Sequence, residues 1–198
     1  WIWSLERMAN TIPTHAVHLT PKAQEFDAIT VAGWCVQKRM SAKVRAMVDL
    51  LVRALLSSEA SDVSLLYLLL YIRNAGSLDA LVTTREGAQQ DRVARGAGTL
   101  SERIATTLPE VHTNACVHTI TQDASGIEAH TREASWRAER VIVAVPAPKV
   151  CDLRFEPGLP APKRQVYARV SMGSTIKCHI TFATHFWRER GLSGELLS

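Results

Sequence analysis

The chain has 198 residues, of which 46% are hydrophobic and 21% are charged, and its formal net charge is +4. These values exclude a disordered chain, which needs low hydrophobicity and a strong charge excess, and they are typical of a globular protein with a buried core. Basic and acidic residues are interspersed, with no basic run that carries aromatics, so we expect no nucleic-acid partner.

The first part of the chain has the residue spacing of helices. Thr20 and Pro21 suit a helix start, with proline at the first helical position. Ser41 can cap a long helix to about residue 58, in which apolar residues recur every three or four positions. We therefore expect the first 60 residues to be mostly helical.

A second long helix follows. Ser61 or Asp62 can cap it, it runs to about Arg73, and Gly76 is a plausible terminator. Because this helix is apolar on most sides, we expect it to be deeply buried. Its apolar run, 65–72, is far shorter than the roughly 20 residues that span a bilayer, so we expect no membrane segment in the chain.

Mixed β-structure is expected from about residue 78. The continuous apolar run 141–145 indicates a strand buried on both faces, and the whole pattern predicts the α/β (α+β) fold class. The expected elements are, in chain order, a β-like run over Ala80–Thr84, a helix over Thr99–Leu108, a hairpin of Val111–Gln122 with Ile127–Arg132, and strands over Trp136–Val145 and Thr175–Phe182.

No residue pattern assigns a function by itself. The segment 96–98 is a glycine loop before a helix and could bind an anion, but it lacks the G-x-G-x-x-G spacing and is more often a tight turn. Lys177 lies in a predicted strand, where lysine usually faces water. The histidines and the cysteines at 35, 116, 151 and 178 are scattered, so we expect free thiols and no metal.

Several segments carry a resemblance when they are read in order. Each is modest alone, but their order and spacing are specific and cover nearly the whole chain. They are Ser61–Ser64, Gly87–Arg92, Gly96–Ile104, Val141–Pro146, Phe155–Pro160, Gly173–Cys178 and Phe186–Arg188. In these segments the chain resembles an interior fragment of the flavin monoamine oxidase family.

The resemblance implies a two-domain fold and an oxidase. Residues 1–93 would be the helical part of the substrate domain, 94–166 part of the FAD-binding domain, and 167–198 the sheet part of the substrate domain. The implied activity is oxidation of a primary or secondary amine to an imine, with O2 reoxidising FAD to give H2O2. The cofactor supplies the hard chemistry, so no acid–base triad is needed.

The resemblance also implies a substrate cavity. Gln89 matches a glutamine that lines it, and Val82 matches an apolar gate between its entrance and its inner part. Leu51, Ala54 and Leu55 match positions of its wall. Leu51 and Ala54 stand where the best-known members carry bulkier side chains. An apolar wall would favour the uncharged amine, because desolvation disfavours an ammonium ion.

The resemblance places four residues near the cofactor. Lys177 matches the family lysine that reaches flavin N5 through a water and helps O2 to reoxidise the flavin. Val117 matches a residue whose backbone meets the adenine end of FAD, and Ala144 and Pro146 lie at a strand end that passes near the flavin. Lys177 should therefore point inward, opposite the Gln89 loop and beneath the helix with the cavity wall.

The sequence departs from the family pattern in three places. The dinucleotide-binding glycine loop would lie before residue 1, and the paired aromatics and flavin-linked cysteine would lie after residue 198. Arg95 stands where relatives often have glycine, which affects the loop before the Thr99 helix. We therefore expect the 198-residue chain alone to bind flavin weakly and not to turn over.

Alternative functions remain open from the sequence. One is a polyamine or L-amino-acid oxidase of the same superfamily, and another is a truncated, non-catalytic product. The full protein could form a homo-oligomer. Its expected location is cytoplasmic, with the mitochondrial outer membrane as the alternative if a C-terminal anchor follows.

Overall fold

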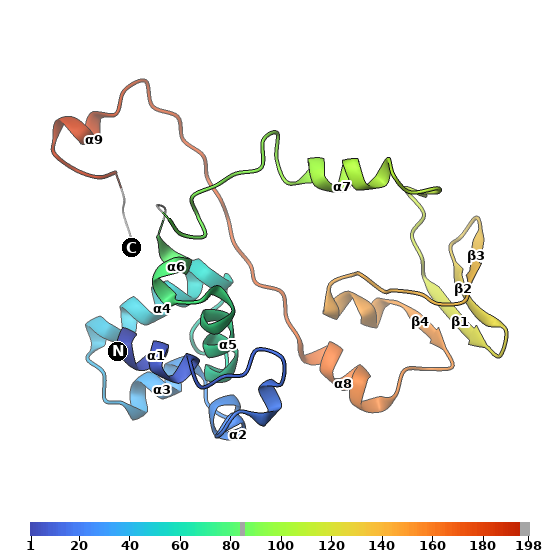
Figure 1. Cartoon of the computed structure of the whole chain (residues 1–198), viewed down its shortest axis with the longest axis horizontal. Coiled ribbons are helices and arrows are strands. Elements are labelled where there is room, and N and C mark those ends of the chain that lie inside the picture. The colour runs from blue at the N-terminus through green and yellow to red at the C-terminus, as the bar shows by residue number, and fades with distance from the viewer. Residues whose placement is uncertain (84–85, 195–198) are drawn as a thin grey trace. The chain divides into compact units, whose positions relative to one another are not determined.

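The computed structural model describes residues 1–83 and 86–194, and the chain divides into two compact units. The first unit comprises Trp1–Gly96 with Gly173–Ser198, and the second comprises Ala97–Met172. Helices build the first unit, and the second contains a four-stranded sheet together with two helices and a 3₁₀ turn (Figure 1). The structure confirms the α/β (α+β) fold class.

The first unit is a bundle of short helices around α5. Helices α1, α2, α3 and α6 all contact α5, and α3 also contacts α4. The bounds are α1 (Ile2–Ala9), the 3₁₀ turn η1 (Val17–Leu19), α2 (Ala23–Asp27), α3 (Val31–Gln37), α4 (Ala42–Leu56), α5 (Leu65–Ala75), α6 (Leu78–Val82) and α9 (Phe186–Glu189).

Helix α4 begins where the sequence predicts, whereas α2 does not. Ser41 caps α4 as predicted, because its hydroxyl accepts the N–H of Val44 at 3.4 Å. The predicted start at Thr20 and Pro21 is wrong, because α2 begins at residue 23 after Lys22, which has a left-handed backbone. A side-chain cap thus determines where α4 begins, whereas α2 has no side-chain cap bond.

Helix α5 begins later than predicted. Its N-cap is Ser64, whose hydroxyl accepts the N–H of Tyr67 at 3.2 Å, and neither Ser61 nor Asp62 caps it. Gly76 follows the helix with φ +91°, as expected of a glycine terminator. Four of its side chains are buried, which confirms the prediction of deep burial.

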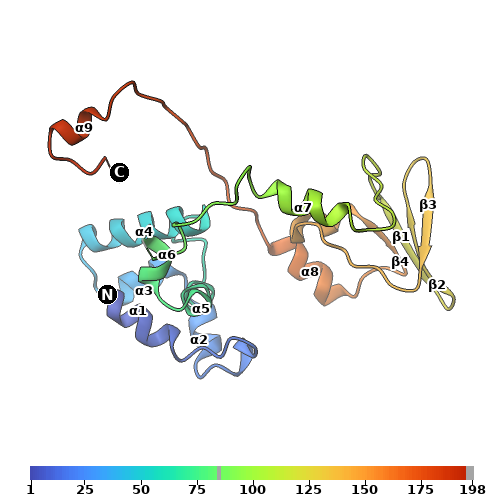
Figure 2. The same ribbon diagram turned by 45° about the horizontal axis from the view of Figure 1, so that its top comes forward.

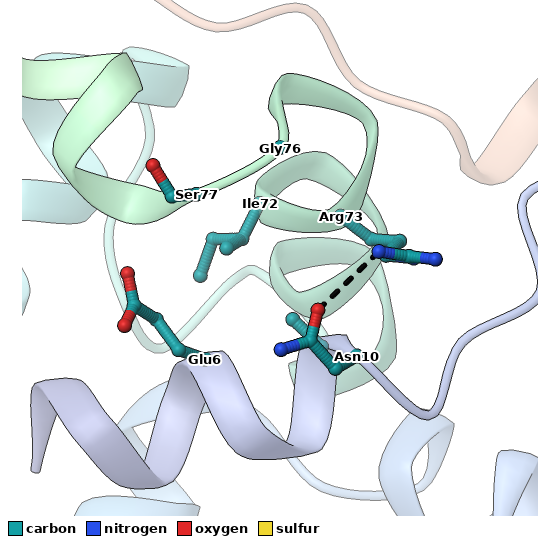
Figure 3. A pocket seen from close by; sticks show the side chains of 7 residues that line it. Glu6, Asn10, Ile72, Arg73, Gly76 and Ser77 are labelled. Atoms are coloured by element: carbon teal, nitrogen blue, oxygen red, sulfur yellow. Dashed lines mark hydrogen bonds between the residues drawn. The ribbon is translucent and has the colours of Figure 1, made fainter.

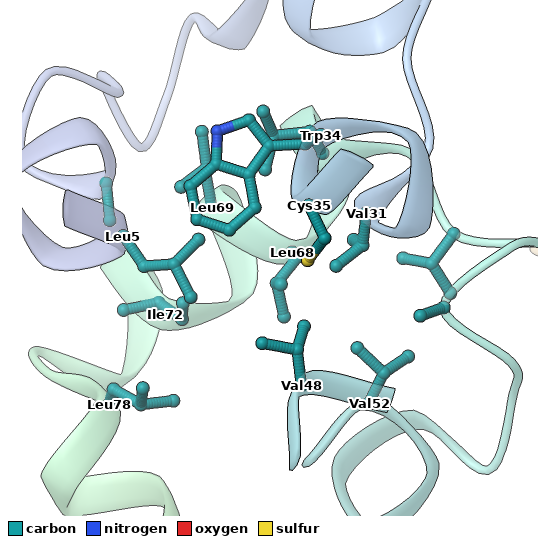
Figure 4. Packing of buried hydrophobic residues seen from close by; sticks show 14 of the residues in the cluster. Leu5, Val31, Trp34, Cys35, Val48, Val52, Leu68, Leu69, Ile72 and Leu78 are labelled. Carbon is teal, nitrogen blue, oxygen red and sulfur yellow. The ribbon is translucent and has the colours of Figure 1, made fainter. Parts of the chain in front are cut away.

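One hydrophobic core fills the bundle (Figure 4). Val48 and Val52 of α4 and Leu68 of α5 have no exposed surface, and Trp34 of α3 is 3% exposed. Burial raises the pKa of the Cys35 thiol in the same core, so this cysteine stays uncharged. Helix α5 thus contributes the largest group of buried side chains to a core of the kind that stabilises helices in proteins.

A carboxylate also ties α4 to the loop before α5. Asp49 accepts the N–H of Ala60 at 3.0 Å and pairs with Arg53 at 2.9 Å. Arg53 in turn contacts Glu59 at 2.7 Å. Because Ala60 is buried, its N–H needs this partner, and the loop stays close to the helix.

The second unit contains a mixed sheet in the order β3-β2-β1-β4 (Figure 2). Strand β1 pairs antiparallel with β2 and parallel with β4. The bounds are α7 (Gly98–Ala105), β1 (Thr119–Asp123), β2 (Gly126–His130), β3 (Ser135–Ala138), the 3₁₀ turn η2 (Ala147–Asp152), β4 (Arg154–Glu156) and α8 (Ala161–Arg169).

The turn between β1 and β2 confirms the predicted hairpin. The N–H and the hydroxyl of Ser125 both donate to Asp123, and these bonds hold the pKa of the Asp123 carboxyl below its usual value. Gly126 has φ +139°, and a Cβ there would lie 2.8 Å from the Ala138 carbonyl oxygen of β3. Glycine is thus required where the turn meets the next strand.

The β-like run predicted over Ala80–Thr84 is wrong. Residues 78–82 form α6 instead, because the hydroxyl of Ser77 accepts the N–H of Ala80 at 3.0 Å and so caps a helix. Thr84 lies outside the described residues.

Three other predicted strands are shortened or absent. Val111–Gln122 reduces to β1, and Trp136–Val145 reduces to β3. The run 141–145 forms no strand and Ile142 is 90% exposed, so the expected burial on both faces is wrong. Thr175–Phe182 also forms no strand. A strand needs a neighbouring strand to pair with, and among the described residues these segments have none.

Candidate functional site

Helix α4 presents the predicted cavity wall. Leu51 and Leu55 are half-buried and pack against the core, and Ala54 is exposed. Their spacing of three and four residues places them on one side of the helix. The structure therefore brings these three side chains together as one small apolar surface.

The structure also brings Val82 and Gln89 close in the fold. Val82 is the last residue of α6 and is 48% exposed. The loop with Gln89 turns back onto the same helix, since the N–H of Ala88 donates to the carbonyl of Ala80 at 2.8 Å. The Gln90 side chain closes the loop by accepting the N–H of Glu86 at 2.6 Å.

Gly87 makes this close approach possible. A Cβ on Gly87 would lie 2.5 Å from the Thr83 carbonyl oxygen and 3.0 Å from that of Ala80. These backbone atoms cannot move aside without shifting α6 or the loop. Only glycine fits there, so Gly87 holds the Gln89 loop against the helix that carries Val82.

We expect Gly87→Ala to displace the Gln89 loop in the full-length protein. Overpacking of this kind costs about 1–3 kcal/mol. If Gln89 lines the substrate path, as the resemblance implies, the expected result is a higher KM for the substrate with a smaller change in kcat. Gly158→Ala is the matched control, since a Cβ at Gly158 would meet nothing within 4 Å. An unchanged KM in Gly87→Ala would contradict the assignment.

Lys177 lies in an exposed, extended segment of the first unit. Every residue from 171 to 185 is exposed, so the Lys177 side chain faces solvent. The expected inward orientation is therefore not present in this chain. Within the described part of the chain, the ammonium group has no ion pair and no hydrogen bond. Its three donors are thus available to another group.

The predicted cofactor residues lie in the second unit. Val117 is half-buried, and its backbone N–H and C=O have no hydrogen-bond partner among the described residues. Ala144 and Pro146 are exposed. The carbonyl of Pro146 accepts the N–H of Lys149 at 2.8 Å, which starts η2.

The departure at Arg95 has a visible backbone consequence. Arg95 has φ +66°, and Gly96 after it has φ +92°. The first value is in the left-handed region, which costs a non-glycine residue roughly 1–2 kcal/mol. Glycine would adopt this conformation without strain, whereas here arginine adopts it before α7 begins at Gly98.

Two hollows of the surface lie away from the predicted residues. One, of about 110 Å³, lies between α1 and α5, where the Arg73 guanidinium donates to Asn10 at 3.3 Å (Figure 3). Nearby, Glu6 accepts the N–H of Leu78 at 3.3 Å. The other, of about 280 Å³, is lined in the second unit by residues of η2, β4 and α8. Neither hollow contains a predicted site residue.

Two kinds of feature are absent from the part of the chain that the structure describes. In residues 1–83 and 86–194, no three histidine, cysteine or acidic side chains converge as a metal site would require. No helix in the same ranges is both long and apolar enough to cross a membrane.

Comparison with known proteins identifies the family. The family described as flavin containing amine oxidoreductase matches residues 13–198. The chain belongs to this family. It is 31% identical over 199 residues to a flavin-containing amine oxidase of Danio rerio, and 28% identical over 196 residues to flavin-containing amine oxidase B of Homo sapiens. These matches cover 99% and 98% of this chain but 38% of each relative.

Solved structures of amine oxidases are also similar. Putrescine oxidase bound to putrescine has a TM-score of 0.88 at 30% identity, over 98% of this chain and 43% of that one. Cyclohexylamine oxidase of Brevibacterium oxydans has a TM-score of 0.76 at 29% identity, over 84% of this chain and 38% of that one. The chain thus spans about two fifths of the length of these oxidases.

Membership in this family implies FAD, and each unit, taken by itself, has groups of a kind that could contact it. Val117 offers an unpaired backbone N–H and C=O, Lys177 offers an unpaired ammonium group, and Ala144 is an exposed small residue. Sequence reasoning missed Gly87 and Gly173, whose close backbone contacts appear only in three dimensions. The one sequence signal was that each glycine opens a segment that resembles the family.

Proposed function

We propose that the full-length protein that contains this chain is an FAD-dependent amine oxidase. It would oxidise a primary or secondary amine to an imine, and O2 would accept the two electrons and two protons to give H2O2. One observation carries the proposal: the family match extends from residue 13 to residue 198, and the same chain has a TM-score of 0.88 to an amine-binding oxidase.

When bound, FAD supplies the chemistry of removing a hydride equivalent from the amine. The chain's own residues would bind and orient the amine. The apolar surface of Leu51 and Leu55 favours the neutral amine, because an ammonium ion loses hydration there. Gln89 can donate and accept hydrogen bonds and would orient the substrate near the Val82 gate.

Lys177 would act on the oxygen side of the reaction. Its ammonium group has three donors and no partner among the described residues, so Nζ can hold a water and stabilise negative charge as oxygen is reduced. This role requires Lys177 to be covered by parts of the full-length protein, since it is exposed in this chain.

A polyamine oxidase is the second candidate, and the similarity to putrescine oxidase favours it. A diamine carries a second positive charge, which needs an acidic or polar partner in the cavity. Of the predicted cavity residues, Leu51, Ala54, Leu55 and Val82 are apolar, Gln89 is uncharged and none is acidic, so none can neutralise that charge. We therefore favour a monoamine. An L-amino-acid oxidase or a non-catalytic truncated product is less well supported.

A substrate panel tests the proposal. The full-length protein is purified with FAD and given alkyl monoamines, aryl-alkyl monoamines, diamines and L-amino acids, and H2O2 release is measured. We expect the fastest release with a monoamine. A preference for diamines would select the second candidate, and no release with any amine by the flavin-loaded protein would overturn the proposal. The 198-residue chain alone should retain little flavin.

Other properties of the full-length protein stay predictions. These are the domain division at residues 93 and 166, a possible homo-oligomer, and a cytoplasmic location with the mitochondrial outer membrane as the alternative. Size-exclusion chromatography and imaging of the tagged full-length protein would test the last two.

A further inference from the structure

The segment that carries Lys177 is attached to the end of α4. The N–H of Ser174 donates to the carbonyl of Ser57, the C-cap residue of α4, at 3.1 Å. Helix ends leave carbonyl groups without helical partners, so this bond satisfies one of them. Both residues belong to the first unit, so the contact lies within one compact part of the chain.

The contact also depends on a glycine. A Cβ on Gly173 would lie 2.8 Å from the carbonyl oxygens of both Leu56 and Ser57, and 2.9 Å from the Ser57 Cβ. Two of these three atoms belong to the backbone at the helix end, so they cannot turn away as a side chain could. Any residue other than glycine must therefore lift the segment from α4.

The attachment limits where Lys177 can lie. Lys177 is four residues further along the chain than Gly173, and a chain of that length spans at most about 14 Å. Along α4, Leu55 and Leu51 lie roughly 3 and 9 Å from Ser57, at 1.5 Å per residue. The attachment thus keeps Lys177 at the end of α4 that carries the predicted cavity wall.

We propose that Gly173 is a positioning residue for Lys177. It acts by allowing the Ser174–Ser57 contact, which fixes the start of the Lys177 segment on α4. This inference rests on the role of Lys177 in the proposed function. It assigns a task to Gly173 and to the carbonyl of Ser57, neither of which is among the predicted substrate-binding or cofactor-binding residues.

The first test measures the contact itself, in flavin-free full-length protein. Hydrogen exchange of the peptide that spans 172–176 should be about tenfold faster in Gly173→Ala than in the natural protein, because one hydrogen bond is lost. Ser174→Ala keeps the N–H, adds no atom at 173 and should exchange normally. Equal exchange rates in the natural protein and in both alanine variants would overturn the proposal.

The second test asks whether Gly173 acts through Lys177. In the flavin-loaded protein, Gly173→Ala should slow reoxidation by O2 between about tenfold and a hundredfold, since small misplacements have effects of this size. Combined with Lys177→Met, it should add no further slowing. A double variant slower than Lys177→Met by the full factor would overturn the proposal, because the effects would be independent. If Gly173→Ala does not fold, Ser174→Pro, which removes the donor without adding an atom at 173, takes its place.

The two possible failures can be told apart. If Lys177→Met slows reoxidation but Gly173→Ala and Ser174→Pro do not, the positioning role is wrong and the role of Lys177 stands. If Lys177→Met reoxidises normally, the role of Lys177 is wrong and the positioning role is overturned with it, whatever hydrogen exchange shows about the contact.

Discussion

Lys177→Met in the full-length protein is expected to slow flavin reoxidation by O2 about a hundredfold. The estimate follows from the loss of one positioned charged donor, which typically costs a factor of 100 to 1000 in rate. Methionine has a similar length but donates no hydrogen bond, so the water held at Nζ would be lost. Flavin reduction by the amine under anaerobic conditions should change much less. Stopped-flow absorbance of the flavin separates the two half-reactions.

Lys43→Met is the matched control for this experiment. Lys43 is exposed in α4 and, like Lys177, has no ion pair within the described part of the chain. It should leave both half-reactions unchanged. If both variants reoxidise at the natural rate, Lys177 has no part in the oxygen reaction.

Leu68→Ala is expected to have the largest effect on stability. Leu68 of α5 has no exposed surface and lies among the side chains of α3 and α4 (Figure 4). Removing a fully buried leucine side chain costs about 2–5 kcal/mol, through lost burial and the cavity that remains. Chemical denaturation of the full-length protein should show a lower midpoint for the transition of the helical unit.

Leu19→Ala provides the comparison for Leu68→Ala. Leu19 in η1 is 69% exposed, so the same substitution removes little buried surface and should change stability by less than about 0.5 kcal/mol. Equal effects of the two substitutions would show that α5 is not the centre of the core.

Local sequence signals predicted the start of α4 and the end of α5, but not the start of α2 or the helix α6. Ser41 and Gly76 act through their own side chain or backbone, so their effects can be read without knowing the tertiary structure. The start of α5 was misplaced by two or three residues because Ser61, Asp62 and Ser64 are all good caps, and only packing decides among them.

The strands were predicted less well, for a physical reason. β-Propensity reflects packing against neighbouring strands as much as the residue itself. The apolar run 141–145 and the segment 175–182 have suitable residues, yet among the described residues neither has a strand beside it. Strands β1 and β2 formed because a tight turn joins them and supplies the partner locally.

For the candidate site, too, some features could be predicted from the sequence and others could not. Residue types at matching positions pointed to Lys177, Gln89 and the α4 wall. The contacts that hold these residues, at Gly87 and Gly173, depend on distances between backbone atoms from separate segments. No composition or spacing rule contains those distances, so only the fold could reveal them.

We expect Lys177 to face the flavin once the full-length protein surrounds it. A crystal structure of that protein with FAD tests this directly. We predict that Lys177 Nζ lies about two hydrogen bonds, roughly 5–6 Å, from flavin N5 with a water between them. A Lys177 side chain that still faces bulk solvent, far from the flavin ring, would contradict the account.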